Sequence, residues 1–128
     1  MARILVIDDD AVQRVLLNAV FRKQGLEVLQ AANGEEGIRL ARGQRPDLIV
    51  SDVNLPEMDG FAVLDHLRKE PITATIPFIL ITANPNEAGQ SMARELGANG
   101  YLPKPISISD LQALVNAQIR KNRDRPAA

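Results

Sequence analysis

Short, unbroken apolar runs recur along this chain, and four of them end in polar residues that can do chemistry. Such runs are typical of parallel β-strands buried on both faces, because helices cover both sides of such a sheet. The four runs end at Asp8–Asp10, Asp52, Thr82 and Lys104. Ligands of an open α/β sheet bind at the carboxyl ends of the strands. We therefore expect these side chains to meet in one crevice.

Predicted strands and helices alternate along the chain, which is the pattern of an α/β domain. The strands are predicted near residues 3–7, 26–31, 47–51, 77–82 and 100–103, and the helices near residues 11–24, 34–43, 60–69, 86–96 and 108–121. Gly37 and Gly89 fall inside predicted helices, where glycine is unfavourable. We expect one domain over residues 1–121, followed by a flexible charged tail or linker stub over residues 122–128.

Five strands with right-handed crossovers allow a doubly wound, five-stranded parallel sheet with helices on both faces and the flavodoxin-like order 2-1-3-4-5. This order makes the first and third strands neighbours, and likewise the third and fourth. It therefore brings the acids, Thr82 and Lys104 to one edge. Pro103 fits a last strand at the sheet edge, where a missing backbone donor is tolerated.

The composition excludes several classes of function. Among the 128 residues, 15 Lys and Arg against 16 Asp and Glu leave a net charge of -1, so no global basic field favours nucleic acid. The lack of cysteine rules out disulfides and thiol chemistry, and a lone His66 cannot form a multi-histidine metal site. No segment approaches the roughly 20 apolar residues of a membrane span, and no apolar leader is apparent. These features predict a soluble cytoplasmic protein.

The predicted crevice combines carboxylates with one ammonium group. Asp8, Asp9 and Asp52 would repel one another, and burial would raise their pKa values further. With Lys104 the group keeps two negative charges in excess, which one Mg²⁺ would neutralise with oxygen ligands. A carboxylate can accept a phosphoryl group as an acyl phosphate. Lys104 and the metal would offset charge on the transferred oxygens, and Thr82 would donate to the same group.

Each of these residues also has a structural explanation. Asp8–Asp10 could merely cap the following helix and favour its positive end. Asp52 could be a turn residue, Thr82 could close a strand, and Lys104 could be a surface lysine. The joint pattern favours the chemical interpretation.

Four motifs in this order closely resemble the receiver domain of bacterial two-component response regulators, of the chemotaxis-regulator kind. The motifs are residues 4–10, 51–60, 81–83 and 97–105, and the resemblance covers residues 3–121. It implies a single-domain phosphoacceptor signalling protein rather than an enzyme. Such a domain takes a phosphoryl group from a phosphohistidine kinase or a small donor and then switches its partner-binding surface.

The resemblance implies a role for each acid. Asp52 should be the phosphoacceptor. Asp9, Asp52 and the backbone carbonyl of Asn54 should hold Mg²⁺ or Mn²⁺ directly, and Asp8 should act mainly through water.

The same resemblance assigns the switch. Thr82 and Lys104 should contact the phosphoryl oxygens, and the Lys104–Pro105 peptide bond should be cis. Tyr101 should follow Thr82, facing solvent before phosphorylation and becoming buried afterwards.

The first predicted helix carries more apolar surface than one core-facing stripe needs. We assign one stripe to the core, namely Leu17, Val20 and Phe21. The other should form a partly exposed patch, namely Val12, Val15, Leu16 and Ala19. Such a patch favours a partner surface, and in the resembled family this helix docks the phosphodonor histidine bundle. The alternative is a helix rotated so that this second stripe is buried.

Three other functions fit parts of the pattern. An aspartate-nucleophile phosphatase of the haloacid dehalogenase kind needs a second acid where this chain has Asn54. A flavodoxin needs a Ser/Thr/Gly-rich phosphate loop where this chain has three acids. A pseudo-receiver would act only as an interaction module, which the intact acids and lysine argue against. We expect a sensor histidine kinase or phosphotransfer protein as one partner, a downstream target or missing output domain as another, and a monomer or weak dimer.

Overall fold

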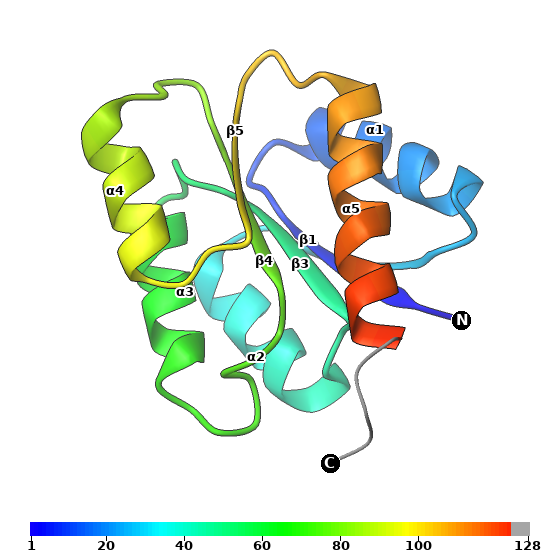
Figure 1. Cartoon of the computed structure of the whole chain (residues 1–128), viewed down its shortest axis with the longest axis horizontal. Coiled ribbons are helices and arrows are strands. Elements are labelled where there is room, and N and C mark those ends of the chain that lie inside the picture. Colours follow the sequence, from blue (N-terminus) through cyan, green and yellow to red (C-terminus); the bar gives the residue numbers. More distant parts are fainter. Residues whose placement is uncertain (124–128) are drawn as a thin grey trace.

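The computed structural model describes residues 1–123, in which five strands and five helices alternate (Figure 1). The strands are β1 (Arg3–Ile7), β2 (Glu27–Ala31), β3 (Leu48–Asp52), β4 (Phe78–Thr82) and β5 (Gly100–Pro103). The helices are α1 (Ala11–Lys23), α2 (Gly34–Gln44), α3 (Gly60–Arg68), α4 (Glu87–Glu95) and α5 (Ile108–Arg123). Every boundary lies within about two residues of the predicted one, which is the usual precision of helix ends.

The strands form one parallel sheet in the order β2-β1-β3-β4-β5, as predicted. In the register of this sheet, Ile7 lies beside Ser51, Asp52 beside Ile81, and Thr82 beside Pro103. The carboxyl ends of β1, β3, β4 and β5 therefore line one edge of the sheet. Proline has no backbone N–H to donate. Because β5 is an edge strand, no neighbouring strand on its open side needs a hydrogen bond from Pro103.

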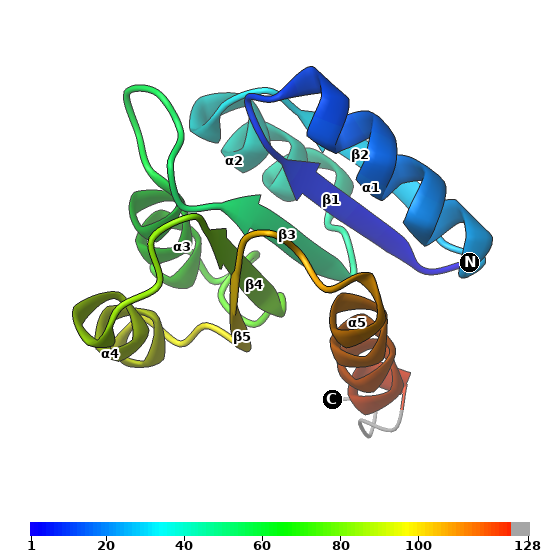
Figure 2. The ribbon, with the colours of Figure 1, turned by 90° about the horizontal axis from the view of Figure 1, so that it is seen from above.

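The side chains of each strand alternate between two hydrophobic cores, one on each face of the sheet. Helices α1 and α5 cover one face, and α2, α3 and α4 cover the other (Figure 2). The α1/α5 core contains Ile4, Val6, Leu17, Phe21, Leu48, Val50, Ile79, Ile81, Leu111 and Val115. The opposite core contains Leu5, Ile7, Ile38, Ile49, Val63, Leu64, Leu67, Phe78, Leu80 and Ala93. Helices on both faces explain why β1, β3 and β4 are apolar over most of their length.

Helix α5 extends two residues beyond its predicted end. It begins after Ser107, whose Oγ accepts a hydrogen bond from the backbone N–H of Asp110 at 3.3 Å. Near its other end, the Asn122 amide donates to the carbonyl oxygen of Asp47 at 3.0 Å. This contact joins the last turn to the start of β3, so residues 122 and 123 are helical rather than part of a tail. The rest of the predicted tail, residues 124–128, lies outside the described residues.

Candidate functional site

Three acidic side chains gather where β1 and β3 end. One carboxylate oxygen from each of Asp8, Asp9 and Asp52 lies within 4.8 Å of the others. Asp52 is the last residue of β3, while Asp8 and Asp9 directly follow β1, and the two strands are paired. Asp8 and Asp52 are buried and Asp9 is exposed, so the cluster is reached from the side of Asp9. The sheet itself thus brings together acids that are far apart in the sequence.

Lys104 completes the cluster from the edge strand. Its Nζ donates a 2.7 Å hydrogen bond to Asp52 Oδ2. Its backbone N–H donates to the carbonyl oxygen of Thr82 at 2.8 Å, which holds the end of β5 against β4. The Lys104–Pro105 peptide bond is cis, as predicted. The ammonium group therefore bridges from the sheet edge to the carboxylate at the end of β3.

The electrostatics of the cluster follow from burial and from like charges. Burial raises the pKa of Asp8 above its ordinary value, and the nearby Asp52 carboxylate adds to this effect. A 2.9 Å hydrogen bond from the backbone N–H of Asp10 to Asp8 Oδ1 acts in the opposite direction without reversing it. Partial burial by itself would lower the pKa of Lys104, but the hydrogen bond and charge of Asp52 outweigh burial and raise it.

Among Asp8, Asp9 and Asp10, which could all have served to cap the first helix, Asp10 is the residue that caps it. Its side chain accepts hydrogen bonds from the backbone N–H groups of Val12 and Gln13, at 2.9 and 3.4 Å, and so caps α1. Asp8 and Asp9 face Asp52 instead. The acidic run therefore divides into one cap and two members of the cluster.

Thr82 and Asn54 lie beside the cluster on neighbouring elements. Thr82 is the last residue of β4, is 2% exposed, and accepts a 3.0 Å hydrogen bond from the backbone N–H of Asn84. Asn54 is exposed, and its backbone N–H lies 3.3 Å from Asp52 Oδ1. Asn54 thus borders the Asp52 carboxylate, and Thr82 ends β4, the strand that pairs with β3.

Arg14 is a neighbour of the cluster that sequence reasoning missed. Its guanidinium group donates a 2.5 Å hydrogen bond to the backbone carbonyl oxygen of Asp8. No helical spacing signals this contact, because Arg14 lies six residues after Asp8, which precedes α1.

Tyr101 is half-buried, which corrects the expectation of a solvent-facing side chain. It lies on β5 and packs against the core beneath α4. A methyl group at Gly89 of α4 would come closer than 3.0 Å to the Tyr101 hydroxyl oxygen. The ring therefore occupies space that exists because α4 has no side chain at this position.

Helix α1 is oriented as predicted, with one apolar stripe in the core and one outside it. Leu17 and Phe21 are fully buried, and Val20 is partly buried in the same core. The second stripe is exposed, at 78% for Val12, 67% for Val15 and 48% for Leu16, with Ala19 also exposed. The rotated-helix alternative is therefore wrong, and an apolar patch lies on the helix that begins beside the acids.

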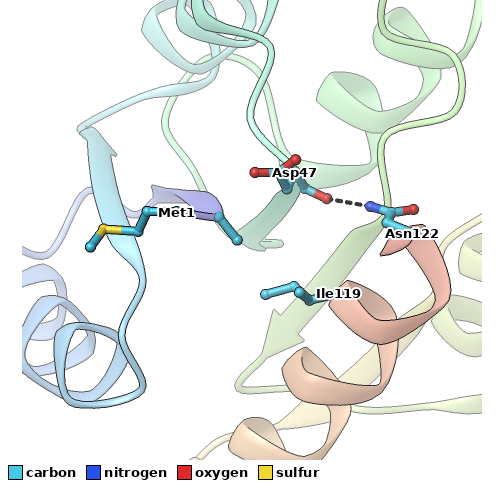
Figure 3. Close-up of a pocket in the computed structure, with 5 residues that line it drawn as sticks. Met1, Asp47, Ile119 and Asn122 are labelled. Carbon is cyan, nitrogen blue, oxygen red and sulfur yellow. Dashed lines mark hydrogen bonds between the residues drawn. The ribbon is translucent and has the colours of Figure 1, made fainter. Parts of the chain in front are cut away.

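A separate cavity of about 300 Å³ lies at the opposite end of the sheet (Figure 3). Its lining residues are Met1, Ala2, Asp47, Ile119 and Asn122. Met1 and Ala2 precede β1 and Asp47 precedes β3, so this cavity is at the amino ends of the strands. It contains none of the predicted site residues, and the chemistry-bearing side chains are at the other end.

The acidic cluster has the composition of a site for a hard divalent cation. Carboxylate oxygens are the ligands that such cations prefer, and the excess negative charge favours binding. The buried Asp52 carboxylate beside an ammonium group also has the features of a phosphoryl acceptor. Within residues 1–123, no helix has the length and hydropathy required to cross a membrane.

Comparisons with known families and sequences find related proteins over most of the chain. A model of the response regulator receiver domain matches residues 4–116. Protein PilH of Pseudomonas aeruginosa is 37% identical over 117 residues, which are 91% of this chain and 97% of PilH. The transcriptional regulatory protein AfsQ1 of Streptomyces coelicolor is 40% identical over 121 residues, which are 94% of this chain and 52% of AfsQ1. The chain thus spans nearly all of PilH but about half of AfsQ1.

Solved structures show the same fold. The chemotaxis protein CheY4 of Vibrio cholerae is 30% identical, with a TM-score of 0.86 over 91% of this chain and 98% of that chain. A putative response regulator from Chloroflexus aurantiacus is 34% identical, with a TM-score of 0.87 over 93% of this chain and 98% of that chain. The family model covers most of the sequence and the solved relatives share the fold, so the chain belongs to the response regulator receiver domain family, whose members act as phosphoacceptors in two-component signalling.

Proposed function

We propose that Asp52 is the phosphoacceptor of this receiver domain and that the surrounding cluster catalyses its phosphorylation. The observation that carries this assignment is the position of Asp52 between two groups of opposite charge. Lys104 donates to its carboxylate at 2.7 Å, while Asp8 and Asp9 offer oxygens within 4.8 Å. Asp52 is also the member of the acidic cluster that Lys104 contacts through a hydrogen bond.

In the proposed reaction, a carboxylate oxygen of Asp52 attacks the phosphorus of a phosphohistidine or of a small acyl phosphate. A P–O bond to Asp52 forms as the P–N bond of phosphohistidine breaks, and the imidazole nitrogen leaves with the bonding electrons. With acetyl phosphate, the P–O bond to acetate breaks instead. Lys104 offsets the negative charge on the phosphoryl oxygens during the transfer, and the Thr82 hydroxyl donates a hydrogen bond to one of these oxygens.

Asp9 and Asp52, together with the backbone carbonyl of Asn54, would hold the divalent cation directly, and Asp8 would act mainly through water. We propose Mg²⁺ as this cation, with Mn²⁺ as a substitute. When bound, Mg²⁺ offsets negative charge on the phosphoryl oxygens. Burial is the largest cause that raises the pKa of Asp8, and the Asp52 carboxylate acts in the same direction. The three carboxylates face one ammonium group, so the cluster keeps an excess of negative charge that favours a cation. Asp9 is the exposed member, so it is the acid that an incoming cation meets first.

The phosphodonor would be a sensor histidine kinase or a phosphotransfer protein that docks on the apolar patch of α1. The patch comprises Val12, Val15, Leu16 and Ala19 and lies on the helix that starts next to the acids. The output would be a change on the surface of α4, β5 and α5, where Tyr101 lies. That surface would act on a separate target or on an output domain.

Labelling with acetyl phosphate tests the assignment of Asp52. The wild type should incorporate an alkali-labile phosphate in the presence of Mg²⁺ and much less in EDTA. Asp52→Asn, which preserves the shape of the side chain, should not be labelled. Asp65→Ala removes an exposed carboxylate on α3 that pairs with Lys69 outside the cluster, and it should label normally. Equal labelling of Asp52→Asn would contradict the assignment, and no labelling of the wild type would favour the pseudo-receiver alternative.

A further inference from the structure

The peptide group between Asp8 and Asp9 is held by a side chain of α1. Its carbonyl oxygen, which belongs to Asp8, accepts a 2.5 Å hydrogen bond from Nη1 of the partly buried Arg14. Among residues 1–122, no other group donates a hydrogen bond to this oxygen. Hydrogen bonds from a charged donor are stronger than those between neutral groups. The orientation of this peptide group therefore depends on Arg14.

The neighbouring backbone groups of the β1–α1 turn have partners of their own. The N–H of Asp8 donates to the carbonyl oxygen of Ala31 on β2 at 3.0 Å. The N–H of Asp10 donates to Asp8 Oδ1 at 2.9 Å, and the Asp10 carbonyl oxygen accepts from the backbone N–H of Arg14 at 3.1 Å. The turn is thus held on both sides of the Asp8–Asp9 peptide, whereas the carbonyl of that peptide is held by the Arg14 side chain.

The Asp9 carboxylate differs from the other two acids of the cluster in its contacts. The Asp8 and Asp52 carboxylates both accept hydrogen bonds from other residues. Asp9 is exposed, and no hydrogen bond to its carboxylate is found within residues 1–122. Its direction therefore depends on its own backbone. Because a peptide group is planar, a turn of the Asp8 carbonyl also moves the nitrogen and Cα of Asp9.

We propose that Arg14 is a positioning residue for Asp9. By holding the carbonyl oxygen of Asp8, it orients the peptide group so that the Asp9 carboxylate faces the cation site. This inference rests on the proposed function, in which Asp9 is a direct ligand of Mg²⁺. Arg14 acts through the backbone, since its guanidinium group forms no ion pair with a carboxylate of residues 1–122.

The charge of Arg14 and its hydrogen bond have opposite effects on a bound cation. A positive charge beside the cluster repels Mg²⁺, so a residue that acted only through its charge would weaken binding. The hydrogen bond to the Asp8 carbonyl prepares a ligand and so strengthens binding. The sign of the change on removing the side chain therefore decides between the two.

Titration calorimetry of Arg14→Met with Mg²⁺ measures this sign. Methionine keeps much of the side-chain length but has neither charge nor donor. The affinity should fall by about tenfold, the lower end for loss of a group that orients a metal ligand. Arg22→Met is the matched control, because it removes the same charge from the last turn of α1, where Arg22 donates to Asn18 at 3.3 Å. Its affinity should equal that of the wild type, and unchanged or tighter binding in Arg14→Met would overturn the inference.

A double variant tests whether Arg14 acts through Asp9. In an Asp9→Asn background the ligand is already lost, so Arg14→Met should cause little further loss of Mg²⁺ affinity. The same fold-loss in both backgrounds would show that Arg14 supports the fold or another ligand instead.

The Mg²⁺ dependence of acetyl phosphate labelling separates positioning from a general structural effect. Arg14→Met should need more Mg²⁺ for half-maximal labelling, while its rate at saturating Mg²⁺ should stay close to that of the wild type. A lower rate at saturation with an unchanged Mg²⁺ requirement would contradict the inference.

The two proposals fail in different ways. If the wild type binds Mg²⁺ but accepts no phosphate, the assignment of Asp52 is wrong, while the titrations still decide the role of Arg14. If the wild type is labelled and Arg14→Met binds Mg²⁺ as the wild type does, Asp52 remains the acceptor and the positioning role is wrong.

Discussion

Lys104 and Asp52 are 52 residues apart in the chain, yet the lysine Nζ lies 2.7 Å from Asp52 Oδ2. The side chain of Asp52 is 5% exposed and that of Lys104 is 27% exposed, so the pair is largely removed from water. The ammonium group is the positive charge that offsets repulsion among the three carboxylates. The same contact therefore contributes to the stability of the fold and, in the proposed function, prepares Asp52 for a phosphoryl group.

Replacing Lys104 by methionine should destabilise the protein. The change keeps most of the side-chain volume but leaves Asp52 without its partner, beside two other acids. Breaking a buried pair is strongly unfavourable, and partial exposure of Lys104 reduces the effect, so we expect a loss of about 2 to 3 kcal/mol. Urea denaturation in EDTA measures this loss.

The matched control is Lys69→Met, which breaks the 3.0 Å pair with Asp65 on the surface of α3. That pair is exposed, at 73% for Lys69 and 43% for Asp65, so its loss should cost at most about 1 kcal/mol. Similar losses in the two variants would mean that the buried pair has no special electrostatic role.

Asp8→Asn should make the metal-free protein more stable at neutral pH. The pKa of Asp8 is raised in the folded state, so folding favours its protonated form. Its contribution is therefore favourable below the ordinary value of 3.8 and becomes unfavourable as the pH rises through the raised pKa. Asparagine cannot ionise, and its oxygen can still accept the hydrogen bond from Asp10.

Thermal unfolding in EDTA over a series of pH values measures this difference. The advantage of Asp8→Asn should be present at neutral pH and should shrink as the pH approaches the ordinary carboxyl range. A variant less stable than the wild type at neutral pH would show that the Asp8 carboxylate is not strained by burial and by Asp52.

The sequence predicted the sheet and the acidic site because both depend on patterns that are local in the chain. The apolar runs predict the strands, and right-handed crossovers allow the observed order of the sheet. Once β1 and β3 are neighbours, the ends of these strands bring Asp8 and Asp9 close to Asp52. Lys104 lies at the same edge of the sheet because it directly follows β5. The exposure of Val12 and Leu16 follows in turn from counting apolar stripes on α1.

Contacts between side chains of distant elements could not be predicted in this way. Gly37 and Gly89 interrupt helical patterns, but periodicity does not say what fills the space. A methyl group at Gly37 would collide with Ile7 of β1, and one at Gly89 would collide with Tyr101. The half-buried position of Tyr101 was missed for this reason, because it depends on an absent side chain on another element.

Asp9→Asn should weaken the binding of Mg²⁺. The change removes one negative charge and one carboxylate oxygen from the cluster while keeping the size of the side chain. Loss of a supporting group at a metal site commonly costs tenfold or more in affinity, so loss of a ligand should cost at least about tenfold. Titration calorimetry with Mg²⁺ measures the change.

Asp10→Asn provides the control for this measurement. It removes a charge from the same acidic run, but Asp10 caps α1, and asparagine caps a helix equally well. Its Mg²⁺ affinity should stay close to that of the wild type. An equal loss of affinity in both variants would mean that general negative charge, rather than Asp9 as a ligand, attracts the cation.

Leu16→Glu should block phosphorylation by a phosphohistidine donor without preventing labelling by acetyl phosphate. Leu16 is 48% exposed in the apolar patch of α1, so a charge there should be tolerated by the fold but not by an apolar docking partner. The small donor needs no docking surface and should still reach Asp52. Phosphotransfer from the cognate kinase or phosphotransfer protein, followed beside acetyl phosphate labelling, measures both reactions.

Ile72→Glu is the control for this last prediction, because Ile72 is 57% exposed between α3 and β4, away from α1. It places the same charge on a comparably exposed apolar residue, so both reactions should proceed as in the wild type. If Leu16→Glu loses both reactions, the substitution has disturbed the acidic cluster rather than a docking surface. If it loses neither, the donor approaches Asp52 from elsewhere, and the apolar patch of α1 is not its binding site.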